Sequence, residues 1–128
     1  MNDITTHNQI SQTLCGTALS VETDHSTVEL TTIEEMAVDN KGLVHGGFIF
    51  GLADYAAMIA VNDPNVVLGA AQVTFKKPIK VGETLKAEAK VVQTEDSKRL
   101  VDVFIKKGES LVFEGSFTCF VLQKHVLD

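Results

Sequence analysis

The chain has 128 residues, of which 45% are apolar and 22% charged, with a net charge of −6 and a sequence pI of about 5.1. This length is typical of one domain, and the composition excludes a disordered chain. No basic cluster suggests nucleic acid as a partner, although single lysines and helix N-termini can still bind a small anion.

Two cysteines, Cys15 and Cys119, lie far apart and show no metal-ligand spacing, so we expect reduced thiols and no metal site. The N-terminus has neither the basic nor the apolar region of a signal peptide, which favours a cytoplasmic protein. The apolar stretch 43–61 approaches the length of a membrane span. It contains His45 and Asp54 and lacks flanking Lys/Arg anchors, so we expect a buried helix and no membrane contact.

Apolar periodicity divides the chain into two early strands, one helix and four later strands. The predicted elements are a short, partly ordered N-terminal helix within 1–15, strands at 16–22 and 26–32 joined by a turn at 23–25, a loop or single helical turn at 33–39, a helix at 47–61, and strands at 66–75, 84–92, 100–106 and 111–122. The regular alternation of the later strands indicates an antiparallel sheet with one covered face. We therefore predict one α+β domain spanning residues 1–128.

The predicted helix is apolar on every face and ends at the stop signal Asn62-Asp63-Pro64-Asn65. A helix of this kind must be enclosed on all sides. One small sheet cannot cover it completely, so we expect its remaining face to meet a second subunit, as in a two-fold dimer.

Asp54 is the one charge in this apolar helix, and a buried carboxylate costs several kcal/mol unless it is paired or protonated. Gly46 and Gly47 lie where the helix begins, where unpartnered N–H groups could hold the oxygen of a polarised carbonyl. Asp54 follows Gly47 by about 10 Å along the axis, at roughly 1.5 Å per residue. One helix cannot apply both features to one atom, but an antiparallel partner helix would bring Asp54 of one subunit towards Gly47 of the other.

The pattern Asn40-x-Gly42-x-x-His45-Gly46-Gly47-x₆-Asp54, followed by Thr74-Phe75-x-x-Pro78, resembles the hotdog-fold acyl-CoA thioesterases. The similarity covers roughly residues 16–122 and is strongest to the PaaI-type (phenylacetic acid degradation) branch. It implies a sheet wrapped around the helix, assembly into homodimers and often homotetramers, an acyl-CoA substrate, and no cofactor or metal beyond the coenzyme A of that substrate.

By the same resemblance, Asp54 would act as a general base on water or attack the thioester directly, and the Gly47 N–H would polarise the carbonyl. Asn40 would orient water or substrate from the facing subunit. His45 would shape the turn or form a hydrogen bond near the thioester. Each of these polar residues could instead have a purely structural role, such as an Asp54 carboxylate that accepts a hydrogen bond from the Asn40 side chain or a backbone amide and so fixes the helix register.

The substrate-binding residues expected around this centre are Gly46, Phe48, Tyr55, Met58, Lys76 and Lys77. The aromatic residues and Met58 would form the core and interface, where some would line an acyl tunnel. The lysines would meet the coenzyme A phosphates or lie solvated at a strand end. Related enzymes often carry Ser or Thr early in the strand after the helix, whereas residues 67–70 here have no hydroxyl.

Two alternatives share the fold. One is a non-catalytic acyl-CoA-binding or sensing domain; such sensors are usually attached to a DNA-binding module, for which we expect no room in 128 residues. The other is a hydratase or dehydratase. Those enzymes tend to pair Asp with His five residues later, or His with a Glu in the helix, but residue 59 is Ile and Asp54 is the only acid in the helix.

Overall fold

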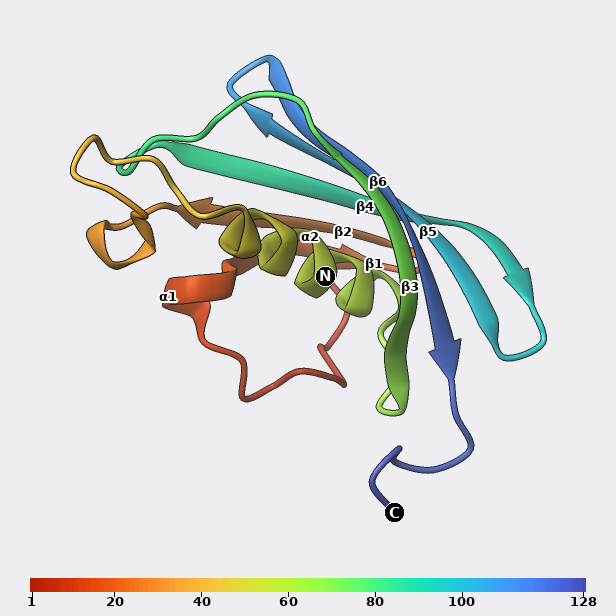
Figure 1. Ribbon diagram of the computed structural model, residues 1–128. Coiled ribbons are helices and arrows are strands. Elements are labelled where there is room, and N and C mark those ends of the chain that lie inside the picture. The colour runs from red at the N-terminus through yellow and green to blue at the C-terminus, as the bar shows by residue number, and fades with distance from the viewer.

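The computed structural model describes residues 1–128 as one antiparallel sheet curved around one long helix (Figure 1). The elements are α1 (Gln12–Cys15), β1 (Thr17–Glu22), β2 (His25–Thr31), the 3-10 turn η1 (Glu34–Met36), α2 (Gly46–Val61), β3 (Val66–Phe75), β4 (Thr84–Glu95), β5 (Lys98–Lys107) and β6 (Ser110–Val121). The strand order is β1-β2-β4-β5-β6-β3. The predicted α+β hotdog architecture is confirmed, and no helix is long and apolar enough to cross a membrane.

The alternation of β4 explains how the sheet covers α2. Leu85, Ala87 and Ala89 are fully buried on the helix side, while the lysines and glutamate between them are exposed on the other face. Alanines at this contact let the helix backbone approach the sheet closely. On the helix, Leu52 is also fully buried, and burial of a side chain of this size stabilises the fold by about 1.5–3 kcal/mol.

Hairpin geometry changes two of the predicted boundaries. His25, expected in a turn, is the first residue of β2 and lies with Nε2 3.4 Å from the Glu88 carboxylate. The turn shortens because Asp24 adopts a left-handed conformation at φ 61°, which a two-residue hairpin turn favours. Likewise, Asp96 at φ 54° lets the β4–β5 ladder continue to Glu95 and Lys98, beyond the predicted strand ends at 92 and 100.

The expected N-terminal helix is reduced to α1, which Ser11 caps by accepting from the Leu14 N–H. The preceding residues run on the side of α2 away from β4–β6 (Figure 1). Asn62, the left-handed C-cap of α2, anchors them: its Oδ1 accepts from the Thr5 N–H at 2.8 Å, and its Nδ2 donates to the Asp3 carbonyl at 2.7 Å. A distant side chain therefore overrides the weak helical spacing of this segment.

We expect Asn62→Gly to release the N-terminal segment while keeping the left-handed cap, because glycine adopts positive φ without strain. The loss of exposed hydrogen bonds should lower the free energy of unfolding by about 1 kcal/mol. Hydrogen exchange should show the Thr5 amide losing protection while the α2 amides keep theirs. The matched variant Asn62→Ala should be less stable by about a further 1 kcal/mol, since it also strains the cap. Unchanged Thr5 protection in Asn62→Gly would contradict this role.

Candidate functional site

The loop before α2 is a tight turn that fixes where the helix begins. Its tip is held by Asp39, whose Oδ1 accepts from the N–H groups of Lys41 at 2.9 Å and Leu43 at 3.2 Å. Gly42, in the same turn, has a backbone φ of 82°, a conformation that glycine adopts readily. His45 then donates its N–H to the Met36 carbonyl at 2.9 Å and becomes the N-cap of α2. Asp39 was not among the expected site residues, although an Asp two residues before a Lys-Gly pair is typical of an Asx turn.

The first turn of α2 offers unpartnered N–H donors at Gly46 and Gly47. Neither has an intrahelical partner, as expected for the first residues of an α-helix, and neither donates to any other oxygen in the structure. No acidic side chain lies in this turn to neutralise the helix dipole. A Cβ on Gly47 would lie 2.9 Å from Nε2 of His45, so the imidazole covers this glycine. The arrangement can hold an oxygen that gains negative charge.

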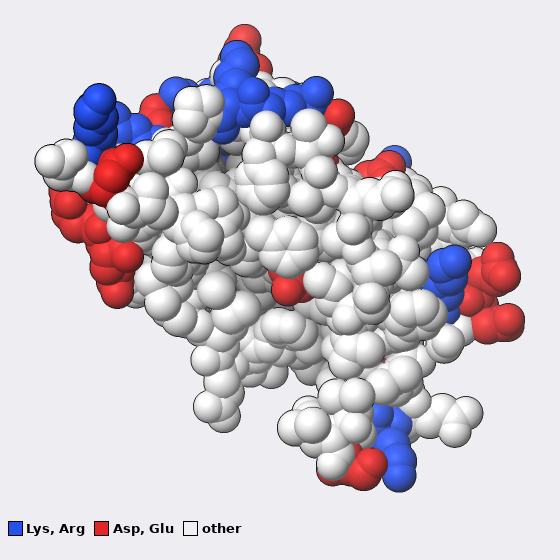
Figure 2. Space-filling model, viewed as in Figure 1, with Lys and Arg blue, Asp and Glu red and all other residues white.

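Asp54 lies on the least buried stripe of α2, together with Gly47, Phe50 and Gly51. Their spacing of three, four and seven residues places them on one side of the helix. A Cβ built on Gly51 would meet nothing within 4 Å, so the stripe faces open space. Figure 2 shows that the face seen in front of α2 is largely free of charged side chains, which gather mainly at its margins.

No side chain or backbone group of the same chain pairs with Asp54: the structure contains no hydrogen bond or ion pair to its carboxylate. The side chain is partly buried, and this burial raises the pKa of the Asp54 carboxyl above its ordinary value. A carboxylate with an elevated pKa is a better proton acceptor. Asp54 can therefore accept a proton from a group delivered to the stripe.

Two thiols lie close enough to sense the charge of Asp54. Burial raises the pKa of the Cys15 thiol and, to a smaller degree, so does the negative charge of Asp54. The same two causes raise the pKa of Cys119 to about 12. Both cysteines are free, as expected. Both cysteines are far from Asp54 in the sequence, so no motif or spacing predicted that they lie near it.

A cavity of about 270 Å³ opens beside the start of α2. It brings together Gly46, Lys76 and Lys77, three of the expected substrate-binding residues, with Phe75 and Ile49 among the apolar lining. The Lys76 ammonium lies 3.3 Å from the Glu114 carboxylate, and the Lys77 ammonium donates to Ser110 Oγ at 2.8 Å. Phe75 and Ile49 were not predicted to line a site.

Other expected site residues lie apart from this cavity. Asn40 is exposed at the tip of the turn and makes no hydrogen bond, including none to Asp54. Tyr55 and Met58 are buried in the core of the subunit. Phe48 packs edge-on against His45, with ring centroids 6.1 Å apart. No group of three or more His, Cys, Asp or Glu side chains is arranged to hold a metal ion.

The strand segment without a hydroxyl contains a bulge between Leu68 and Ala70. A Cβ on Gly69 would lie only 2.5 Å from Cε2 of Phe120. The Phe120 ring therefore occupies the place that a side chain at this position would need. The structure offers no replacement hydroxyl to Asp54.

Comparison with known proteins identifies the family. The model of the thioesterase superfamily matches residues 41–114, which include the end of the turn, α2 and most of the sheet. This chain belongs to the thioesterase superfamily. The resemblance that its His-Gly-Gly turn and Asp54 suggested is thereby confirmed, whereas the roles of those residues are not tested by it.

Several similar proteins match most of this chain. An uncharacterized protein of Pyrococcus horikoshii is 53% identical, with a TM-score of 0.98 over 99% of this chain and 98% of its own. An Aquifex aeolicus protein named methylthioribose-1-phosphate isomerase is 50% identical over 94% of this chain but only 26% of its own length. The transcription factor FapR of Caldanaerobacter subterraneus is 33% identical over 73% of this chain and 47% of its own. The chain thus spans about a quarter to a half of these two curated relatives.

Two solved structures with more informative descriptions share the fold at lower identity. The Escherichia coli PaaI protein, from the phenylacetic acid degradation operon, is 25% identical, with a TM-score of 0.74 over 80% of each chain. A Streptococcus mutans protein solved with acetyl-CoA is 24% identical, with a TM-score of 0.81 over 92% of this chain and 97% of its own.

We expect Asp54→Asn to stabilise the folded protein at about pH 7. The folded-state pKa of Asp54 lies above the ordinary value of 3.8, so ionisation costs folding free energy and wild-type stability falls as pH rises through this window. Asparagine removes that cost. Denaturant unfolding at several pH values should show the variant's advantage disappearing below about pH 4. A variant less stable than the wild type at about pH 7 would instead indicate a structural hydrogen bond to Asp54.

Proposed function

We propose that this protein is an acyl-CoA thioesterase that hydrolyses an acyl-CoA to a free acid and coenzyme A at a site shared by two subunits. The observation that carries the proposal is the stripe on α2, where an unpaired carboxylate of raised pKa lies about 10 Å from unpartnered N–H groups. The two features match the two needs of thioester hydrolysis, a proton acceptor and a site for the oxyanion.

In this mechanism the Gly47 N–H polarises the thioester carbonyl of the substrate. Asp54 takes a proton from water as the water oxygen bonds to the carbonyl carbon, and a tetrahedral oxyanion forms. When the carbon–sulfur bond breaks, the proton on Asp54 passes to the departing thiolate. Alternatively, the Asp54 carboxylate attacks the carbonyl carbon, and the carbon–sulfur bond breaks to release the coenzyme A thiolate. Water then hydrolyses the resulting anhydride to the free acid and Asp54, and the proton that this water releases neutralises the thiolate. Both routes use the same two residues, and coenzyme A takes part only as a piece of the substrate.

The edge strand β3 supports a two-fold dimer. The sheet has two edges, and the β1 edge is partly occupied, since the Asn2 N–H donates to the Val21 carbonyl at 2.7 Å. β3 is longer, with ten residues, and has exposed small residues such as Ala70 along a free backbone edge. Such an edge favours pairing with another strand. Antiparallel pairing of two β3 strands would set the two α2 helices side by side in opposite directions.

The cavity beside Gly46 suits the coenzyme A portion of the substrate. It opens next to the N–H donors, and Lys76 and Lys77 supply positive charge at its rim. The same fold holds acetyl-CoA in the Streptococcus mutans protein. Pairing β3 with a second β3 would bring these lysines close to the interface, where a thioester could reach Asp54 of the other subunit. Asn40, His45, Phe48, Tyr55 and Met58 keep their expected roles in this proposal.

We expect Asp54→Asn to lower thioester turnover by about 10² or more, in line with the loss of a general base. The measurement is free-thiol release from a panel of short, medium and aromatic acyl-CoAs, with wild type and variant in parallel. Light scattering and circular dichroism should show the same oligomer and fold for both proteins. Equal rates for the two would remove Asp54 from the mechanism.

A catalytically silent acyl-CoA sensor is the second candidate. The similarity to FapR, a transcription factor, favours it, although the chain spans only 47% of that protein. The thiol-release panel separates the two functions. Saturable acyl-CoA binding by the wild type with no release from any substrate would favour the sensor.

Mixed dimers should reveal a shared site. Gly47→Pro removes the N–H donor and is tolerated in the first helical turn, while Gly47→Ala adds the same Cβ but keeps the donor. We expect Gly47→Pro and Asp54→Asn each to be nearly inactive. In an equimolar mixture refolded together, about half of the dimers are mixed and each has one intact site, so about a quarter of wild-type activity should return.

Gly47→Ala is the control for crowding against His45, and it should lose much less activity than Gly47→Pro. Equal losses in both would assign the defect to the displaced imidazole. No recovery in the mixed dimers, with subunit exchange verified by mass spectrometry, would place Asp54 and Gly47 in a site within one subunit.

A further inference from the structure

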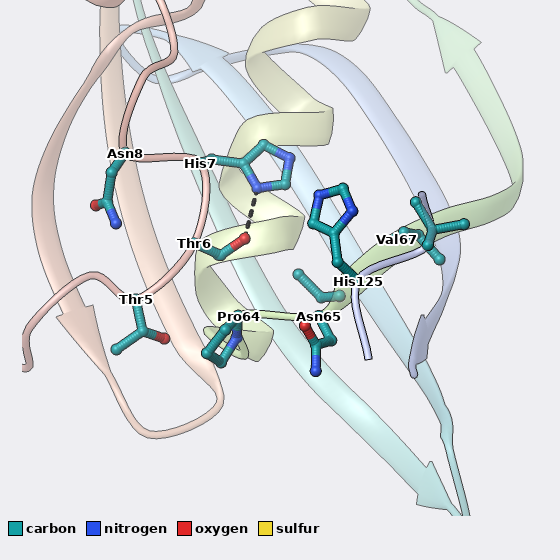
Figure 3. A pocket seen from close by; sticks show the side chains of 10 residues that line it. Thr5, Thr6, His7, Asn8, Pro64, Asn65, Val67 and His125 are labelled. Atoms are coloured by element: carbon teal, nitrogen blue, oxygen red, sulfur yellow. Dashed lines mark hydrogen bonds between the residues drawn. The ribbon is translucent and has the colours of Figure 1, made fainter. Parts of the chain in front are cut away.

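A second cavity, of about 410 Å³, lies at the opposite end of α2 from Gly47. It is lined by three segments that are distant in sequence, 5–8 of the N-terminal segment, 64–67 at the start of β3, and 125–126 of the C-terminal tail (Figure 3). The N-terminal and C-terminal segments lie outside residues 41–114, which match the thioesterase superfamily. The cavity is therefore built largely by segments outside the range that matches the family.

Two imidazoles line this cavity, His7 from the N-terminal segment and His125 from the tail. In Figure 3 their rings face the same space from opposite sides. His7 is partly buried in a left-handed conformation at φ 56° and packs against Tyr55, with ring centroids 6.4 Å apart. Burial lowers the pKa of the His7 imidazole, which favours its neutral form at neutral pH.

The hydrogen bonds of the two rings bear on which ring nitrogen can donate into the cavity. Nδ1 of His125 accepts from the Leu127 N–H at 3.1 Å, so neutral His125 is protonated on Nε2. Nδ1 of His7 lies 2.8 Å from the Thr6 hydroxyl, which has no other partner in the structure. When this hydroxyl donates to Nδ1, the ring proton of neutral His7 lies on Nε2 as well. Both Nε2–H groups are then free to donate.

The remaining lining contains no acidic side chain. It consists of Thr5, Thr6, Asn8, Pro64, Asn65, Val66, Val67 and Val126. The side-chain amides of Asn8 and Asn65 have no hydrogen-bond partner in the chain and can also donate. A cavity with several free N–H donors and no carboxylate fits a ligand oxygen that carries negative charge.

We propose that this cavity is an anion subsite, in which the Nε2–H groups of His7 and His125 donate to an oxygen of a phosphate or carboxylate group. Two sources share this chemistry, a phosphate of coenzyme A and a free anion. The first source rests on the proposed thioesterase dimer, where antiparallel pairing of β3 would bring the start of one β3 near the end of the other. Lys76 and Lys77 of the second copy would then lie close to this cavity.

The test is imidazole NMR at about pH 7, which is practical because the chain has only four histidines. Inorganic phosphate, coenzyme A and pantetheine are titrated separately into the wild type, His7→Gln, His125→Gln and His25→Gln. His25 is the control, since it lies on β2 beside Glu88, away from the cavity. We expect saturable shifts of the His7 and His125 signals with an anion. Either cavity variant should weaken binding by about tenfold, as for loss of a hydrogen bond to a charged group.

Each source gives its own pattern. Shifts with coenzyme A but not with pantetheine identify a coenzyme A phosphate, whereas shifts with inorganic phosphate alone identify a free-anion site. Both results support the subsite. Neither depends on thioester turnover, so the anion subsite can be confirmed even if the protein shows no thioesterase activity. No shift with any anion, or equal shifts at His25, would overturn the proposal. Binding unchanged in both His7→Gln and His125→Gln, with folding verified by circular dichroism, would also overturn it.

Discussion

The enclosure of α2 by one sheet is the constraint on which the rest of this structure depends. The helix is apolar on every face, so it gains most from burial, and the buried alanines of β4 let it lie close to the sheet. A curved sheet of six strands still leaves one stripe of the α2 surface uncovered. That stripe, from Gly47 to Asp54, is where the chain exposes backbone donors and a carboxylate together.

Asp54 is costly to the isolated subunit. Its carboxylate is partly buried, has no partner in its own chain, and has a raised pKa, so its ionised form opposes folding. Residues that serve only stability are rarely left in this state, because a neutral side chain of the same size would remove the cost. Perturbed ionisable groups of this kind are enriched at functional sites. The energetics thus point to Asp54 independently of the sequence pattern that first singled it out.

The parts of the chain outside the family match extend the fold at the far end of α2. Asn62 ends the helix and also anchors the N-terminal segment, which carries His7 to the cavity shared with the C-terminal tail. One helix therefore organises both cavities. Its N-terminus lies beside Gly46, Lys76 and Lys77, and its C-terminus lies beside the paired imidazoles. A two-fold dimer through β3 would bring the two kinds of cavity towards each other.

The sequence by itself determined the elements, the enclosed helix, and the pairing of Asp54 with Gly47 on one helix face, because periodicity and helix geometry are local properties. Tertiary structure alone decided the rest. Three features join residues that are far apart in the chain. They are the hydrogen bond from the Thr5 N–H to Asn62, the two thiols near Asp54, and the cavity that His7 and His125 both line. Local patterns carry no information on which distant segments meet, since that depends on how the sheet curves around α2 and where the terminal segments pack.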